Sequence, residues 1–189
     1  MKRLKIMALV LVLLLAFSSA ALAGPPGQSR RAPAPGDQSI AEIAIAADFT
    51  ELVAALVYVD EELGTGLVDL FMEGTDQYTV FAPTNEAFEN LYEAQGYNDL
   101  RDVEPEVVLE VLLYHVVEGR RAANSVVPPV RDRTITTLLG ETFTVNRDAE
   151  ITDFAGQEAE IVAANISASN GVIHVIDTVI LPFVPEPED

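Results

Sequence analysis

The chain contains no cysteine and no tryptophan, and it has only two histidines among its 189 residues. Without cysteine it forms no disulfide, carries no thiol nucleophile and offers no thiolate to a metal. Two histidines without a His-Glu-x-x-His spacing do not predict a zinc site. No Gly-x-Ser-x-Gly elbow and no glycine-rich phosphate loop are found either. The sequence therefore predicts no catalytic residues, no metal and no cofactor.

Positive charge is also scarce. Eleven Lys and Arg residues face 30 Asp and Glu residues, which gives a formal net charge of −19. Three of the basic residues and none of the acidic ones precede Gly24, so removal of the first 23 residues leaves a net charge of −22. Such a surface repels phosphate groups, which excludes nucleic acid and anionic lipid as partners. One hypothesis for this acidic composition is that the protein works in a salty medium, which screens the repulsion between its charges. The alternative is that the negative charge serves only to keep the protein soluble.

The N-terminus has the pattern of a secretory signal peptide over residues 1–23. Lys2, Arg3 and Lys5 precede an apolar run over residues 6–17, and small residues stand before Gly24. The run is shorter than the ~20 residues of a membrane-spanning helix, so we expect cleavage, secretion and no membrane insertion afterwards. Residues 24–38 contain Gly, Pro, Ser and Arg with no apolar period, which indicates a flexible leader. Residues 183–189 form an acidic tail.

The intervening residues 39–182 are predicted to form one α+β domain. Helical spacing of apolar residues is concentrated in the first half and strand-like segments in the second. Ser39 and Glu42 form a capping-box pattern before the first predicted helix, and Pro105 is typical of a first helical position. The predicted strands of the second half span residues 134–138, 142–146, 160–166 and 172–181.

Residues 78–88 are predicted to form a strand, a turn and a helix start. Residues 78–81 alternate and are rich in aromatic and β-branched side chains, which favours a half-buried strand. Pro83 ends that strand because it has no N–H to donate. Thr84 is then a suitable N-cap for the following helix.

Three stretches resemble the signatures of the fasciclin-like domain family. They are Thr-Val-Phe-Ala-Pro-Thr-Asn-Glu-Ala-Phe at residues 79–88, Leu-Leu-Tyr-His-Val-Val at residues 112–117, and Asn-Gly-Val-Ile-His-Val-Ile-Asp at residues 170–177 with Leu-Pro following at 181–182. The resemblance implies a fasciclin-like wedge, a β-sandwich of about seven strands with helices packed along one edge. It also implies a secreted adhesion protein.

Four polar residues of these signatures are candidate structural residues: Thr84, Asn85, His115 and Asp177. Asp177 is predicted to alternate with apolar residues on the last strand and to sit at the rim of the core. A carboxylate there needs hydrogen-bond donors. The hypothesis is that Asp177 accepts from the Thr84–Asn85 turn or from His115 and ties the three signatures together. A catalytic Asp–His pair is the less favoured interpretation, because no nucleophile accompanies it. His174 is expected to be a partly exposed strand residue.

Tyr114 and His115 are the candidate binding residues, because the resemblance implicates the Tyr-His signature in cell adhesion and integrin contact. The alternative is that Tyr114 packs in the core and His115 caps a helix end. No Arg-Gly-Asp tripeptide occurs. Asp148, Glu150 and Asp153 lie close together in the sequence but lack the glycine and the bidentate glutamate of a calcium loop, so calcium is not predicted.

Two functions remain open at the level of the sequence. The first is a monomeric, secreted, non-enzymatic adhesion or matrix-interaction module that binds an extracellular protein or polysaccharide. The second is an extracellular domain that binds a small ligand or a glycan. A concave pocket with convergent polar and aromatic groups would favour the second, and an exposed apolar patch would favour the first.

Overall fold

A computed structural model describes residues 35–185 of the chain. The predicted signal peptide, residues 24–34 of the leader and residues 186–189 of the tail lie outside the described residues. The helices are α1 (Ile40–Ala46), α2 (Thr50–Leu63), α3 (Leu67–Glu73), α4 (Asn85–Gln95), the short 3-10 helix η1 (Leu100–Asp102), α5 (Pro105–Tyr114) and α6 (Ala123–Val126). The strands are β1 (Tyr78–Pro83), β2 (Val116–Glu118), β3 (Arg133–Thr136), β4 (Thr142–Val145), β5 (Glu150–Thr152), β6 (Glu158–Ala168) and β7 (Gly171–Ile176).

The predicted helix starts are found where local chemistry places them. The Ser39 hydroxyl accepts from the Glu42 N–H at 3.2 Å, and the Glu42 carboxylate accepts from the Ser39 N–H at 2.8 Å, which completes the capping box. Thr84 caps α4 by accepting from the Ala87 N–H at 3.2 Å. The Pro105 start of α5 is also confirmed. These short-range features were predictable because each depends on residues within one helical turn.

All seven strands are hydrogen-bonded in the order β2-β1-β7-β6-β5-β4-β3. β1 and β7 run parallel at residues far apart in sequence, while the remaining neighbours are antiparallel. A hydrogen bond of 2.7 Å from the Leu138 N–H to the Val116 carbonyl brings the chain beyond β3 back to β2. The sheet therefore curves into a nearly closed wedge, and the α+β prediction with seven strands is confirmed.

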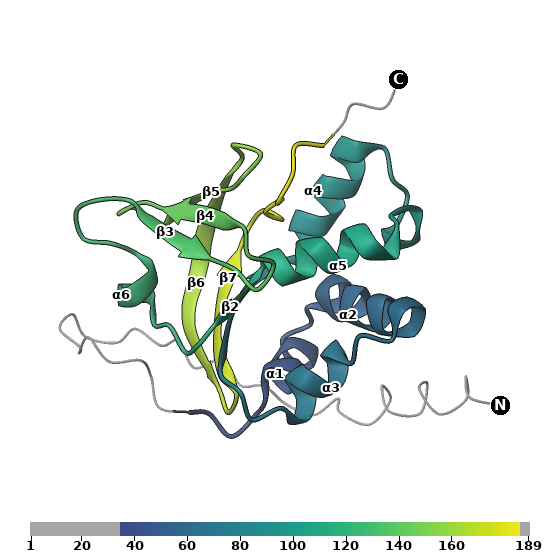
Figure 1. Ribbon diagram of the computed structural model, residues 1–189, viewed down its shortest axis with the longest axis horizontal. Helices are drawn as coiled ribbons and strands as arrows, with labels where there is room; N and C mark the ends of the chain where they lie inside the picture. The colour runs from purple at the N-terminus through teal and green to yellow at the C-terminus, as the bar shows by residue number, and fades with distance from the viewer. Residues whose placement is uncertain (1–34, 186–189) are drawn as a thin grey trace.

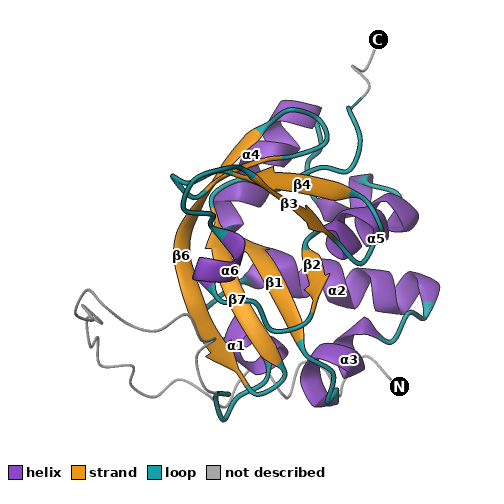
Figure 2. Cartoon of the chain, turned by 60° about the vertical axis from the view of Figure 1, so that its left-hand side comes forward, coloured by secondary structure: helices purple, strands orange, loops and turns teal. Residues whose placement is uncertain are grey.

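The helices α1 to α5 lie together on one side of the curved sheet (Figure 1). Figure 1 also shows β7 and β2 between those helices and the smaller β3–β4–β5 region, and Figure 2 shows β1 beside β7. Two groups of buried side chains follow from this arrangement. One joins α1–α5 to the sheet around Val59, Phe71 and Phe88, and the other fills the inside of the curved sheet around Phe81, Phe143 and Ile151.

Several elements were missed by the sequence pattern. β2, β5, η1 and α6 have three or four residues each, too few for a period to be visible. The last strand ends at Ile176 and not near Leu181 as predicted, so the chain turns at Asp177. The final part of the leader also differs from a flexible segment. Gly36 donates to the Ala168 carbonyl at 3.2 Å, and Ser169 donates to the Gln38 carbonyl at 2.7 Å.

The close approach of Gly36 to β6 explains why a glycine stands there. A Cβ atom at this position would lie 2.2 Å from the Ser167 carbonyl oxygen, which no side chain could accommodate without moving the backbone. Residues 36–38 are consequently held against the domain. Within residues 35–185 no helix combines the length and the apolar character that crossing a bilayer demands.

Candidate functional site

The three signature stretches meet around His115, at the end of α5. The Phe81 N–H of the strand–helix corner donates to the His115 carbonyl at 2.9 Å, and the Thr84 N–H donates to the Ile176 carbonyl of β7 at 3.0 Å. The His115 Nε2 atom accepts from the Ile180 N–H at 3.2 Å. The corner, the helix end and the closing segment are therefore joined in space, as the sequence hypothesis required.

The imidazole of His115 is a buried, neutral structural group. Only 2% of the residue is exposed, and its Nδ1 atom lies 2.7 Å from the Val111 carbonyl one turn earlier in α5. Because Nε2 accepts from Ile180, the ring proton resides on Nδ1 and is donated to Val111. Burial lowers the pKa of His115 to about 4, so the ring is uncharged at pH 7. It caps the helix end by hydrogen bonding and not by a positive charge.

Asp177 does not join the signatures, and that prediction was wrong. The residue is exposed, and its carboxylate accepts from the Glu160 N–H at 2.8 Å and from the Thr178 hydroxyl at 3.1 Å. The physical reason is the early end of β7: the alternation that would have turned Asp177 toward the core stops at Ile176. Asp177 instead hydrogen-bonds to β6 at the end of the β6–β7 ladder.

The buried carboxylate that hydrogen-bonds to the closing segment belongs to Asp153, which the sequence analysis did not identify as a structural residue. Asp153 is 6% exposed, and it accepts from the Leu181 N–H at 2.8 Å and from both the backbone and the side-chain amide of Gln157. Three donors compensate the cost of burying this charge. The local sequence pattern did not predict the burial of Asp153, because its partner Leu181 lies 28 residues away.

Asn85 connects the strand–helix corner to the loop between α1 and α2. Its side-chain oxygen accepts from the Glu51 N–H at 3.1 Å, and its side-chain nitrogen donates to the Asp48 carbonyl at 2.9 Å. Asp48 has a positive φ of 62°, a conformation that such an external hydrogen bond helps to hold. Asn85 thus fixes how α2 lies against α4.

Tyr114 lies fully inside the domain, with no exposed surface. Its hydroxyl donates to the Thr142 carbonyl at 2.9 Å and accepts from the Phe154 N–H at 3.1 Å, and its ring contacts Phe143 edge to face. Burial raises the pKa of Tyr114 to about 12. Tyr114 and His115 are therefore both interior residues, and neither side chain offers a contact surface.

His174 is also buried, and the expectation of partial exposure was wrong. It has no exposed surface, because β7 is a central strand covered on both faces. Its Nε2 atom lies 3.0 Å from the Arg121 carbonyl, and its Nδ1 atom accepts from the Asn165 N–H at 3.4 Å. The ring packs beside Phe81, and burial lowers the pKa of His174.

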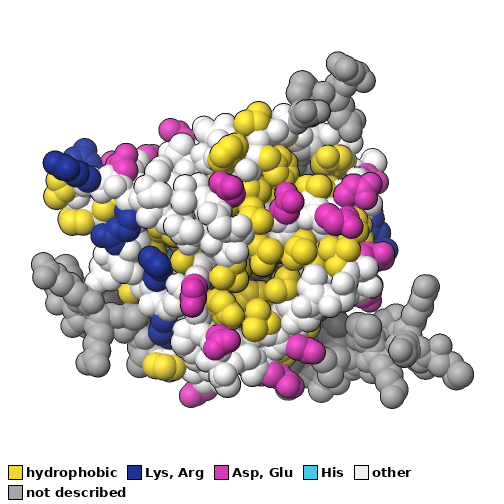
Figure 3. All heavy atoms as spheres, viewed as in Figure 1, with side chains coloured by type: hydrophobic (Ala, Val, Ile, Leu, Met, Phe, Trp, Pro, Cys, Tyr) yellow, Lys and Arg dark blue, Asp and Glu magenta, His cyan; other side chains and the backbone are white. Residues whose placement is uncertain are grey.

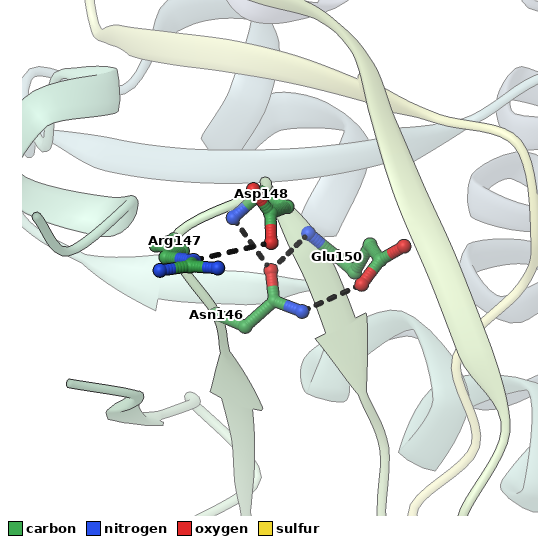
Figure 4. A network of polar contacts seen from close by, with 4 residues as sticks. All are labelled: Asn146, Arg147, Asp148 and Glu150. Carbon is green, nitrogen blue, oxygen red and sulfur yellow. Dashed lines mark hydrogen bonds and ion pairs between the residues drawn. The ribbon is translucent and has the colours of Figure 1, made fainter. Parts of the chain in front are cut away.

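The acidic residues considered for calcium do not converge. Figure 4 shows Asp148 and Glu150 folded back on their own turn, where Asn146 accepts from both of their N–H groups and donates to the Glu150 carboxylate at 2.6 Å. The carboxylate of Asp148 pairs with Arg147 at 3.4 Å. Asp153 lies at the other end of β5 with its own donors. Residues 35–185 contain no group of three or more His, Asp or Glu side chains that could hold a metal ion.

An apolar depression of about 120 Å³ lies between the helices; we call it the helical hollow. It is lined by Ile40, Ala41, Ala44 and Ile45 of α1, Leu52, Val53, Leu56 and Val57 of α2, Leu67, Val68, Phe71 and Met72 of α3, and Leu112 and Leu113 of α5, with Val80, His115 and Val116 beneath. Figure 3 shows apolar side chains gathered on this face, over the region of α1, α2 and α5, with carboxylates around them.

The helical hollow offers almost no polar group to an occupant. His115 is the one residue of its lining with a polar side chain, and both of its ring nitrogens are already hydrogen-bonded. A second, smaller cavity of about 50 Å³ lies on the other side of Leu52, Leu112 and His115, toward α4. The site is thus an apolar recess whose floor is held by the junction around His115.

The fold is a small α+β domain with an apolar recess among its helices. The chain belongs to the fasciclin domain family, whose profile matches residues 47–182. The family resemblance drawn from the three signatures is confirmed by this match.

Curated relatives support the same family. Protein sll1483 of Synechocystis is 38% identical over 136 residues, which cover 71% of this chain and 67% of that protein. The cell surface glycolipoprotein MPB83 of Mycobacterium bovis is 34% identical over 116 residues, which cover 61% of this chain and 48% of that protein. The chain is also similar to a solved FAS1 domain pair from the insect cell adhesion molecule fasciclin I. That likeness has 19% identity and a TM-score of 0.49, and it covers 69% of this chain and 45% of the other.

Proposed function

We propose that this chain is a secreted, non-enzymatic adhesion or matrix-interaction module that binds extracellular proteins or surface polymers. Membership of the fasciclin domain family supports an adhesion-type role, and one relative is named as a cell surface glycolipoprotein. The signal-peptide pattern of residues 1–23 supports export. Export to the medium or to a surface places the acidic domain where a partner can reach it.

The observation that carries the proposal is the exposed apolar character of the helical hollow. Ile45 is 55% exposed, and Val53, Leu56, Val57 and Leu113 are all half-buried. Exposed apolar side chains that gather on one face of a folded domain are typical of an interaction site. By contrast, the buried polar groups Tyr114, His115, Asp153 and His174 have their hydrogen bonds satisfied within the domain, which fits a structural role better than a catalytic one.

The alternative is an extracellular domain that binds a small ligand. The lining of the helical hollow is apolar, so a small ligand in it should be apolar too. Its volume of about 120 Å³ is comparable to the ~150 Å³ of an engineered cavity that binds benzene. A glycan fits less well, because His115 is the one polar side chain of the lining and both of its ring nitrogens are already hydrogen-bonded. Native mass spectrometry of the protein purified from its producing cells tests this alternative by the mass of a co-purified ligand.

Retention of partners by the immobilised protein tests the proposed function. The purified protein is coupled to beads, incubated with extracellular material of the producing cells at low and high salt, and compared with beads that carry heat-denatured protein. We expect specific proteins or polymers on the native beads alone. Equal retention on both kinds of bead, or none on either, would contradict an adhesion role.

A further inference from the structure

The helices that line the helical hollow contain acidic side chains and no basic ones, and the basic residue Arg101 of η1 lies close to Glu62 and Glu106. The four helices that line it, α1, α2, α3 and α5, carry nine carboxylates and no Lys or Arg. Three of the nine have structural partners: Glu42 in the capping box, Glu51 with the Tyr92 hydroxyl, and Asp60 at the start of α3. The remaining six are exposed: Glu61, Glu62, Asp69, Glu73, Glu106 and Glu110.

The shape of the apolar surface indicates the kind of occupant. The hollow itself has room for about one large apolar side chain. The hollow is open to solvent, since Ile45 of its lining is 55% exposed. A small molecule held deep in the hollow would leave the exposed part of Ile45 uncovered, whereas a segment of polypeptide covers both.

We propose that the helical hollow docks a cationic amphipathic segment of a partner protein. One apolar side chain of that segment inserts between α2, α3 and α5, and its Lys and Arg side chains lie against the exposed carboxylates of the surrounding helices. Apolar anchors at helical spacing that enter a groove are a recurring recognition mode, and the complementary charge speeds association and sets the orientation. This inference rests on the proposed function and names the chemistry of the partner.

A synthetic peptide tests the proposal without knowledge of the natural partner. The probe is a fluorescein-labelled helix of about 18 residues built from Leu and Lys, with Leu at helical spacing on one face. A scrambled peptide of the same composition removes the apolar stripe but keeps the charge, and a third peptide carries Glu in place of Lys. By fluorescence anisotropy we expect saturable binding of the probe, and dissociation constants at least about tenfold weaker for both control peptides.

Substitutions in the hollow locate the contact. Val53→Gln and Val57→Gln place amides in the lining of α2, while Ala54→Gln changes an exposed position of the same helix outside the lining. We expect about tenfold weaker binding of the probe for Val53→Gln and Val57→Gln, and less than about twofold change for Ala54→Gln. Far-UV circular dichroism and thermal melts show that each variant is folded.

Substitutions on the border test the charge. The double variant Asp69→Asn with Glu73→Gln removes two exposed carboxylates of α3, and Glu89→Gln with Glu93→Gln removes two from α4, which does not line the hollow. We expect weaker probe binding for the α3 variant at about 0.05 M salt and a smaller difference at about 1 M salt. The α4 variant should bind almost as the parent does.

Three results would overturn the proposal. Equal binding of the scrambled peptide would reduce the effect to net charge. An unchanged dissociation constant for Val53→Gln and Val57→Gln would place the contact elsewhere. Saturable binding of the neutral dye Nile red in the hollow, without binding of the probe, would make it a small-molecule site. If native beads still retain partners in any of these cases, the proposed function stands and only the docking site is lost.

Discussion

The Nε2 atom of His115 accepts a hydrogen bond from the Ile180 N–H at 3.2 Å, across 65 residues of sequence. This contact joins the end of α5 to the segment that follows β7. It depends on a neutral ring, because a protonated imidazole has no acceptor nitrogen. We therefore expect the junction beneath the helical hollow to be sensitive to acid.

Acid should destabilise the protein through His115. The folded-state pKa is lowered from 6.5 to about 4, so between these pH values the unfolded chain binds a proton that the folded protein does not. The free energy of unfolding should fall by about 1.4 kcal/mol per pH unit from this residue as pH decreases from 6.5, and the fall should end below the folded pKa. Urea unfolding at pH 7, 6 and 5 in about 1 M NaCl, which screens the acidic surface, measures it.

A His115→Gln variant serves as the control for that pH dependence. Its glutamine has no group that titrates between pH 7 and 5, so the variant should be less stable at pH 7 but lose less stability on acidification. His174 contributes in the same direction in both proteins, since burial lowers its pKa too. Parallel pH profiles of parent and variant would show that His115 is not the acid-sensitive group.

Asp153→Asn should destabilise the domain much more than Asp177→Asn. The amide that replaces the Asp153 carboxylate turns a donor toward groups that are themselves donors, including the Leu181 N–H. We expect a loss of about 2–3 kcal/mol in the free energy of unfolding for Asp153→Asn, and less than about 1 kcal/mol for the exposed Asp177. Urea unfolding of the two variants decides between them, and equal losses would contradict the assignment.

Tyr114→Phe should lower stability without changing partner binding. The substitution removes only the hydroxyl, which leaves the Thr142 carbonyl and the Phe154 N–H without this partner. A loss of about 1–3 kcal/mol in the free energy of unfolding is expected. Retention of partners by immobilised folded variant should match that of the parent. Loss of retention by a variant that remains folded would give the tyrosine hydroxyl a role in binding.

The melting temperature should rise with salt. The predicted mature protein has a net charge of −22, so its carboxylates repel one another. Salt screens this repulsion, because the Debye length falls from ~10 Å at 0.1 M to ~3 Å at 1 M salt. Thermal melts monitored by circular dichroism at low and high NaCl measure the effect. A Glu61→Gln, Glu62→Gln variant removes two adjacent exposed charges and should show a smaller rise. A melting temperature that does not increase with salt would contradict adaptation to a salty medium.

The amino-acid sequence by itself determined the family, the α+β class and the local signals that begin and end helices. The Ser39 capping box, the Thr84 cap and the Pro105 start each involve neighbours within one helical turn, so their geometry follows from the sequence directly. The three signatures also predicted that a corner, a helix end and a closing segment meet.

Only the tertiary structure decided which side chains make that junction. Asp177 is exposed because β7 ends at Ile176, the residue before it, and not near Leu181 as predicted. The buried carboxylate is that of Asp153, which accepts from the Leu181 N–H. Burial of Tyr114 and His174 likewise depends on which strands become central in the sheet. The helical hollow is assembled from four helices whose apolar residues look like ordinary core positions in sequence. The periodicity of apolar residues predicts that a side chain faces inward. Only the packing of the helices against one another determines whether the space it faces is filled.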